Sequence, residues 1–381
     1  MKRIGVMILT LCLITAWIPT AAHAAPAEVS AKSAILMDAA TGTILYEQNA
    51  HEKLAPASVT KVMTMLLIME AIDRGQIGWD DMVTASESAA AKGGSQIYLK
   101  VGETMSVTDM VKSIAVSSAN DCACAMAEHI AGSEAAFVEL MNKRAEELGM
   151  HDTHFVNCTG LDDEPNAAEH LTSAHDIAIM SRQLLANHPE IKKFTTIWMD
   201  TVRNGTFGLS NTNKLVRFYS GATGLKTGFT AKAGYCLSAS ASRDGMELIA
   251  VVMGSATSKD RFAACKQLLD YGFANYALVS PKTPGQQVSV KLGSADSVTA
   301  IPSRSPNFLI DKSQKNAVSV TMELESGITA PVSKGQRLGT LTVRCADRIL
   351  EQIPLVAESA VPKLTWGQMF TRILKQISMS R

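Results

Sequence analysis

The stretch Ser58-Val-Thr-Lys61-Val-Met-Thr-Met-Leu-Leu-Ile-Met-Glu-Ala-Ile72 decides the fold, because apolar side chains occur on nearly every side of the helix that it predicts. Such a helix has almost no polar face and is expected at the centre of a core. The spacing of Ser58 and Lys61 places both on one face, one turn apart. A lysine at the buried end of this helix is desolvated, so its neutral amine can activate the serine hydroxyl. The pair alone is a weak signal, because a helix N-cap followed by a surface lysine gives the same pattern.

Patterns on both sides of this helix predict an α+β domain. Residues 34–38 and 43–47 alternate as a β-hairpin that turns near Gly42. Helical patterns cover residues 107–115, 121–131, 134–148 and 259–271, and strand patterns cover 234–242 and 246–254. Strands from both ends of this region therefore bracket a cluster of helices.

The length and the charge of the chain limit its possible domain organisation and partners. Its 381 residues, 46% of them hydrophobic, exceed what one compact domain needs, so we expect two folded units. The composition changes near Pro281, which predicts one domain over residues 25–280 and a small all-β domain over 281–358. Lysine plus arginine and aspartate plus glutamate number 36 each, so no nucleic-acid partner is expected.

The N-terminus has the pattern of a secretory signal. Met1-Lys-Arg3 precedes an apolar run over residues 4–18 and the small residues of Ala22-His-Ala24, which predicts export and cleavage that removes residues 1–24. The alternative, a retained anchor, is disfavoured because the run is shorter than the roughly 20 residues that span a bilayer. Six cysteines remain after cleavage, and we expect buried free thiols rather than three disulfides, because most lie in apolar runs.

Two further motifs carry polar side chains suited to catalysis. Ser118-Ala-Asn120 lies in a turn between two helical patterns, where a hydroxyl can relay a proton and a carboxamide can hold a peptide carbonyl. Lys226-Thr-Gly-Phe-Thr230 opens a predicted strand, and the absent side chain of Gly228 would let substrate lie against it. Helix capping and a basic turn are the alternative readings of these motifs. His151 and His154 lack a third ligand at metal-binding spacing, so no metal or other cofactor is expected.

In this order, the three motifs resemble those of low-molecular-mass penicillin-binding proteins of the D-alanyl-D-alanine carboxypeptidase family. Supporting stretches are Leu54-Ala-Pro-Ala-Ser58, Asn157-Cys-Thr-Gly-Leu-Asp162, Gly224-Leu-Lys-Thr-Gly-Phe-Thr230 and Pro331-Val-Ser-Lys-Gly-Gln336. The resemblance implies a penicillin-binding/β-lactamase-like transpeptidase fold, with an antiparallel sheet and a helical cluster. It makes residues 25–280 a serine peptidase domain and the peptidoglycan stem peptide its substrate.

The resemblance also implies the roles of the site residues. Ser58 would attack the D-Ala-D-Ala bond with Lys61 as general base, while Ser118 and Asn120 would pass protons and orient substrate. The remaining residues would bind substrate: the backbone amides of Ser58 and Phe229 as oxyanion hole, Gly228 along the peptide, and Lys226, Thr227 and Arg261 at the terminal carboxylate. β-Lactams would acylate the same serine as covalent inhibitors. An ordinary surface charge is the alternative reading of Arg261.

Other functions on the same serine remain open at this stage. Ala119 in the second motif is typical of the carboxypeptidases rather than of class A β-lactamases. The acidic loop Asp163-Glu-Pro-Asn166 lacks the sequence expected of a β-lactamase deacylation loop and is interpreted as solvated. The alternatives are a DD-endopeptidase, a β-lactamase or a non-catalytic penicillin-binding sensor.

The last segment, residues 359–381, predicts an amphipathic helix. Apolar residues recur at helical spacing at Trp366, Met369, Phe370, Ile373, Leu374 and Ile377. Lysine and arginine supply the only charges after Glu358, so the helix is expected to lie on anionic lipid at the outer face of the cytoplasmic membrane. The alternative is a helix that docks on its own β domain. The sequence predicts no oligomeric state.

Overall fold

The computed structural model describes residues 28–163 and 165–379, with side chains of the final helix described up to Arg372. The predicted signal segment and Glu164 of the acidic loop lie outside the described residues. Among the described residues, no helix has both the length and the apolar character needed to cross a bilayer.

A five-stranded antiparallel sheet forms the backbone of the first domain, in the order β2-β1-β9-β8-β7. Its strands are β1 (Ser33–Asp38), β2 (Ile44–Gln48), β7 (Ala222–Thr230), β8 (Gly234–Arg243) and β9 (Met246–Ser255). The four strands predicted from the sequence are confirmed. The prediction that Lys226 opens a strand is wrong, because β7 begins at Ala222, which pairs with Ala241 of β8. Glycine weakens the sequence pattern of a strand, so the pattern does not reveal the residues around Gly224. Pairing with β8 nevertheless extends β7 through Gly224.

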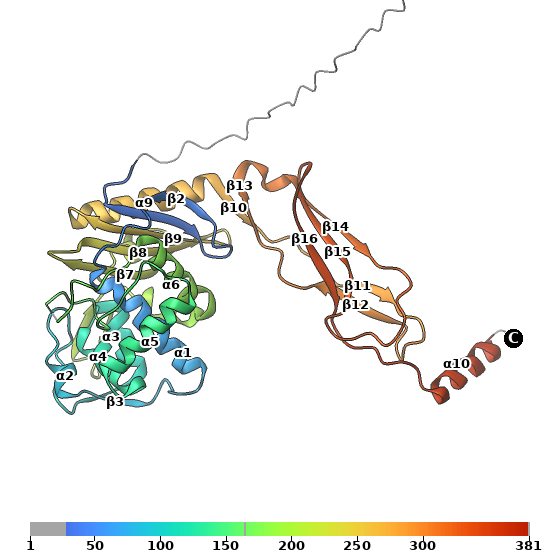
Figure 1. Ribbon diagram of the computed structural model, residues 1–381, viewed down its shortest axis with the longest axis horizontal. Coiled ribbons are helices and arrows are strands. Elements are labelled where there is room, and N and C mark those ends of the chain that lie inside the picture. Colours follow the sequence, from blue (N-terminus) through green and yellow to red (C-terminus); the bar gives the residue numbers. More distant parts are fainter. Residues whose placement is uncertain (1–27, 164, 380–381) are drawn as a thin grey trace, which may run out of the picture.

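Both faces of this sheet are covered, which explains why its central strands are buried throughout. Ile35 and Met37 of β1 belong to the larger core, which includes α1 (Lys61–Asp73) and α6 (Ala174–Asn187). Leu36 points to the other face, where α9 (Ser258–Asn275) packs. Figure 1 shows α9 on one side of the sheet and the other helices on the opposite side. Because successive side chains of a strand point to opposite faces of the sheet, they pack into two separate cores.

Helix α1 lies at the centre of the larger core, as predicted. Ten of its residues are buried, from Lys61 to Ala71. Ser58 does not belong to the helix proper; it lies in the 3-10 turn η1 (Ala57–Thr60) that leads into it. Around α1 pack α3 (Val107–Ser117), α4 (Asn120–Ala131), α5 (Glu134–Glu147) and α6.

Shorter elements complete this region: β3 (Met82–Thr84), α2 (Glu87–Ala90), β4 (Thr104–Ser106), η2 (Pro189–Ile191), α7 (Lys192–Thr195), β5 (Met199–Val202), β6 (Phe207–Ser210) and α8 (Leu215–Phe218). Helices and an antiparallel sheet thus share one domain, as the predicted α+β class requires. The six cysteines from Cys122 to Cys345 are buried free thiols in the described chain, as expected.

The C-terminal part is built almost entirely of strands around its own core. Its main sheet has the order β11-β12-β16-β15-β14, and β10 (Tyr276–Val279) pairs separately with β13 (Phe308–Asp311). The strands of the main sheet are β11 (Gln286–Ser289), β12 (Ser297–Pro302), β14 (Val318–Leu324), β15 (Arg337–Cys345) and β16 (Arg348–Ala357), with the turn η3 (Lys312–Ala317) before β14. Its core is separate from the two cores of the first domain. Helix α10 (Trp366–Met379) follows at the far end of the molecule (Figure 1).

Candidate active site

The centre of the candidate site is the contact between Ser58 and Lys61. The Nζ atom of Lys61 lies 2.9 Å from Oγ of Ser58 and donates to the carbonyl oxygen of Thr159 at 2.7 Å. Lys61 is fully buried, whereas Ser58 is half-buried. Burial lowers the pKa of the Lys61 amine to about 7, although the charge of Asp121 works in the opposite direction. A large fraction of the amine is therefore neutral near neutral pH and able to accept the serine proton.

The second motif brings two unpartnered polar atoms to the neighbourhood of α1. Ser118 ends α3 in the left-handed conformation, with φ of 66°, and Asn120 begins α4 directly afterwards. The amide Nδ2 of Asn120 donates to the carbonyl of Gly93 at 2.7 Å, which fixes the orientation of the carboxamide. The Ser118 hydroxyl and Oδ1 of Asn120 are buried with no hydrogen-bond partner among the described residues. Buried polar atoms without partners are costly and are often reserved for a ligand.

The third motif lies on β7, the edge strand that packs against η1. Lys226 is fully buried, and its Nζ donates to the carbonyl of Thr227 at 3.0 Å. Burial lowers the pKa of the Lys226 amine well below its usual value, and the positive charges of Lys61 and Arg261 lower it further. The Thr227 hydroxyl donates to the hydroxyl of Thr212 at 2.7 Å. A free carboxylate would relieve the repulsion among these cations, so the arrangement suits an anionic substrate group.

Gly228 lies where β7 meets the turn η1. A Cβ atom at this position would lie 2.6 Å from the carbonyl oxygen of Pro56 and 3.1 Å from the backbone nitrogen of Ser58. The space that its missing side chain leaves is therefore filled by the turn that carries Ser58. Sequence alone does not reveal that η1 packs on β7, and binding of substrate along Gly228 stays a prediction.

Arg261 and Phe229 border the third motif. The reading of Arg261 as a surface charge is wrong, because the residue is only 8% exposed. Its guanidinium donates to the carbonyls of Gly228 and Cys236 at 3.0 and 3.3 Å, and its Nε has no partner among the described residues. The ring of Phe229 is 54% exposed and stacks on Tyr235 with centroids 4.2 Å apart.

Several supporting residues could not be found from the motifs. Thr159 supplies the carbonyl that holds Lys61, although it is 98 residues away in sequence. The buried carboxylate of Asp121 accepts hydrogen bonds from the backbone amides of Ile97 and Leu99. Thr212 reaches Thr227 from the segment before α8. Two signals are available in sequence: Asp121 directly follows the second motif, and Thr159 lies in the supporting stretch over residues 157–162.

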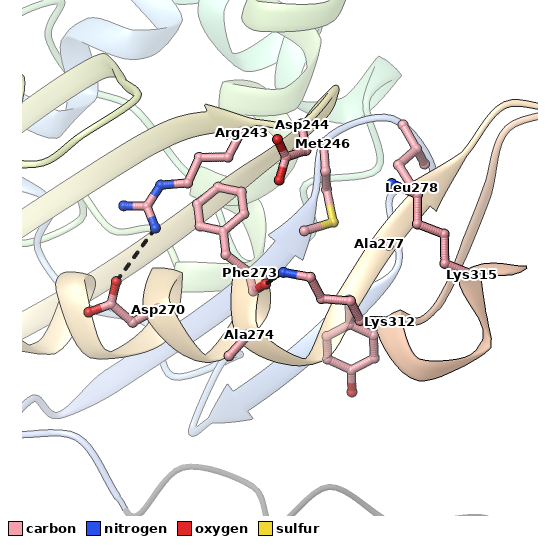
Figure 2. A pocket seen from close by; sticks show the side chains of 11 residues that line it. Arg243, Asp244, Met246, Asp270, Phe273, Ala274, Ala277, Leu278, Lys312 and Lys315 are labelled. Atoms are coloured by element: carbon pink, nitrogen blue, oxygen red, sulfur yellow. Dashed lines mark hydrogen bonds and ion pairs between the residues drawn. The ribbon is translucent and has the colours of Figure 1, made fainter.

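A separate cavity of about 380 Å³ lies where α9 meets β10 and η3. Arg243 and Asp270 face each other across it, and Lys312 donates to the carbonyl of Phe273 (Figure 2). None of the predicted site residues lines this cavity. Two of its cations, Arg243 and Lys312, are engaged by neighbouring protein groups, and we place the chemistry at Ser58 instead.

Comparisons with known proteins identify the family of the chain. Residues 19–257 match the family model described as D-alanyl-D-alanine carboxypeptidase, and residues 273–363 match the penicillin-binding protein 5 C-terminal domain. The chain is 45% identical to the D-alanyl-D-alanine carboxypeptidase DacF of Bacillus subtilis, over 87% of this chain and 86% of that protein.

The chain is also similar to solved structures of penicillin-binding proteins. Penicillin-binding protein 5 of Haemophilus influenzae superposes with a TM-score of 0.75 at 32% identity, covering 90% of this chain and all of that one. Penicillin-binding protein D2 of Listeria monocytogenes in its cefotaxime-bound form superposes with a TM-score of 0.60 at 32% identity, covering 66% of this chain and 100% of that one. The chain therefore belongs to the D-alanyl-D-alanine carboxypeptidase family and is a low-molecular-mass penicillin-binding protein.

Proposed function

We propose that this enzyme removes the terminal D-alanine from peptidoglycan stem pentapeptides through an acyl-enzyme on Ser58. The observation that carries the proposal is the 2.9 Å contact between Oγ of Ser58 and the buried amine of Lys61. Nearby, the Ser118 hydroxyl and Oδ1 of Asn120 have no partner among the described residues, and both are groups that a peptide substrate could engage.

Acylation follows from these groups. The neutral Lys61 amine takes the Ser58 proton as Oγ bonds to the carbonyl carbon of the penultimate D-alanine. The C–N bond then breaks, and the proton passes through Lys61 or Ser118 to the leaving amine of the terminal D-alanine. Water subsequently attacks the ester, and the proton it loses returns to Ser58 as the serine is released.

The substrate is held along β7 in this proposal. The backbone amides of Ser58 and Phe229 stabilise the oxyanion, where loss of one donor typically costs about 10²–10³ in rate. Asn120 holds the peptide backbone, and Lys226, Thr227 and Arg261 receive the terminal carboxylate. In the part of the chain that the structure describes, no strand pairs with the outer edge of β7, which supports an extended peptide lying beside it.

β-Lactams acylate Ser58 in the same geometry, with the lactam C–N bond in place of the peptide bond. The similarity to a penicillin-binding protein solved in its cefotaxime-bound form supports this proposal. The acyl-enzyme keeps the tethered leaving amine near Ser58, so we expect its hydrolysis to be slow.

The test is release of D-alanine from a diacetyl-Lys-D-Ala-D-Ala peptide by wild type, Ser58→Ala and the exposed-site control Ser88→Ala. We expect release by wild type and Ser88→Ala, and neither release nor labelling by a fluorescent penicillin in Ser58→Ala. Rapid penicillin hydrolysis without peptide release would instead identify a β-lactamase. Stable labelling without release would identify an endopeptidase or a sensor.

We also propose that the protein is exported by cleavage after Ala24 and held at the outer face of the cytoplasmic membrane by residues 359–381. The described part of α10 supports this, because Trp366 and Phe370 are 87% and 65% exposed. The β domain over residues 281–358 would then separate the peptidase domain over residues 25–280 from the lipid. Vesicles containing phosphatidylglycerol should bind the mature chain, and truncation after Glu358 should abolish binding while D-alanine release continues.

A further inference from the structure

We propose that His170 is a positioning residue for Ser58, acting through Thr60. This inference rests on the proposed role of Ser58 as nucleophile. His170 lies more than a hundred residues from Ser58 in sequence and belongs to none of the three motifs. The structure nevertheless connects its ring to the turn η1 by an unbroken series of three hydrogen bonds, of which the two nearest η1 are buried.

The direction of each bond in this series follows from the first one. The backbone N–H of Val156 donates to Nδ1 of His170 at 3.1 Å, so Nδ1 carries no proton. A neutral imidazole then carries its proton on Nε2, which lies 2.8 Å from Oγ1 of Thr60. Since Nε2 donates to Thr60, the Thr60 hydroxyl is free to donate its own proton to the carbonyl of Ala57 at 2.9 Å. All three donors therefore point from the Val156 loop toward η1.

The end of this series is a strained backbone position beside the nucleophile. Ala57 has φ of 47°, in the left-handed region that non-glycine residues rarely adopt. Such strain, about 1–3 kcal/mol, persists only where the surroundings hold it in place. The Thr60 bond to the Ala57 carbonyl is one such restraint, and this carbonyl belongs to the peptide unit that also contains the Ser58 amide nitrogen. Its orientation therefore determines where that N–H points.

The restraint acts inside a closely packed region. A Cβ atom at Gly160 would lie 1.9 Å from the Ala57 carbonyl oxygen and 2.8 Å from Oγ1 of Thr60. The loop that carries Gly160 also supplies the Thr159 carbonyl that holds Lys61. His170 thus sits between the turn of the nucleophile and the loop of the general base.

The backbone around His170 joins the same two segments. Leu171 exchanges backbone hydrogen bonds with His154, and Thr172 exchanges them with Leu54, four residues before Ser58. His170 is 3% exposed and packs edge-to-face on Phe155. Burial lowers its pKa to about 4, with smaller contributions from the charges of His154, Lys232 and Lys61, so the ring stays neutral as the bond series requires.

Two substitutions separate positioning from general support of the fold. His170→Gln keeps a donor that can reach Thr60 in place of the imidazole Nε2. His170→Asn is too short to reach Thr60, so its carboxamide stays near the Val156 amide. The readout is the second-order rate of Ser58 acylation by a fluorescent penicillin, with kcat and KM for D-alanine release measured in parallel. Thermal unfolding reports stability, and Phe137→Leu, in the core on α5, serves as a destabilised control.

We expect His170→Asn to acylate about 10-fold to 100-fold more slowly than wild type, with the loss in kcat rather than KM. His170→Gln should stay within about threefold of wild type, and Phe137→Leu should acylate normally below its unfolding temperature. Thr60→Val should reproduce the His170→Asn defect, and the double variant should be no slower than either single variant.

Equal acylation rates for His170→Asn and His170→Gln would overturn the proposal, as would additive losses in the double variant. The proposed function fails separately, if Ser58→Ala still releases D-alanine. Penicillin acylation measures Ser58 directly, so the His170 result stands even if the physiological peptide differs.

Discussion

Gly228→Ala tests whether the missing side chain on β7 makes room for the nucleophile rather than for substrate. The added Cβ would lie 2.6 Å from the Pro56 carbonyl oxygen and 3.1 Å from the Ser58 nitrogen. An ordinary contact begins at 3.4 Å, so η1 and β7 must separate by about 0.8 Å. Both contacts are with backbone atoms, so no side-chain rotation can relieve them.

This displacement moves the hydroxyl and the backbone amide of Ser58 together, which are the proposed nucleophile and one proposed oxyanion donor. A misplacement of about 1 Å typically reduces the rate about 10²-fold, which corresponds to about 2.7 kcal/mol in the activation free energy. Overpacking should also lower the free energy of unfolding by about 1–3 kcal/mol. We therefore expect a folded protein whose acylation by a fluorescent penicillin is about a hundredfold slower.

The assay is stopped-flow or gel-based penicillin acylation, with circular dichroism to verify folding. Gly208→Ala in β6 is the matched control, because a Cβ there meets nothing within 4 Å. It should acylate at the wild-type rate. If Gly228→Ala is folded and acylates within about threefold of wild type, the turn is not held against β7 as described and the reasoning is refuted.

Three further outcomes follow from the same geometry. Because Lys61 must be neutral to accept the Ser58 proton and its pKa is about 7, kcat/KM should fall about tenfold per unit of pH below that value and level off above it; a flat profile from pH 5 to 8 would contradict this role. Asp121→Asn removes a charge that raises the pKa of Lys61, so the acid limb of the profile should move to lower pH, and a shift to higher pH would reverse the assignment. Thr212→Val removes the acceptor that orients the Thr227 hydroxyl, and should raise KM several-fold with kcat within about twofold, as steady-state kinetics can check.

Features that depend on local pattern could be predicted well. The helix after Ser58 is apolar all round, so any globular fold must bury it, and α1 is buried along most of its length. The same argument predicts the desolvated Lys61, because the residue starts that helix. The hairpins β1–β2 and β8–β9 join strand-forming runs through short turns, and both are present.

Features that depend on which segments meet were missed or wrong. Arg261 has the pattern of an exposed helical charge, yet it lies 8% exposed against the backbone of β7 and β8. β7 begins before Lys226, at Ala222, because pairing with β8 carries the strand through Gly224. Neither contact leaves a periodic signal in the residues that make it.

The sequence by itself determined the family, because each motif consists of residues close together along the chain, and it predicted Ser58 and Lys61 as the reacting pair. Only the tertiary structure decided that Thr159 holds the Lys61 amine, that Gly228 accommodates the Ser58 turn and that His170 reaches Thr60. The physical reason is the same in each case. These contacts close long loops of the chain, and the free energy that selects one closure over another comes from packing of the whole core.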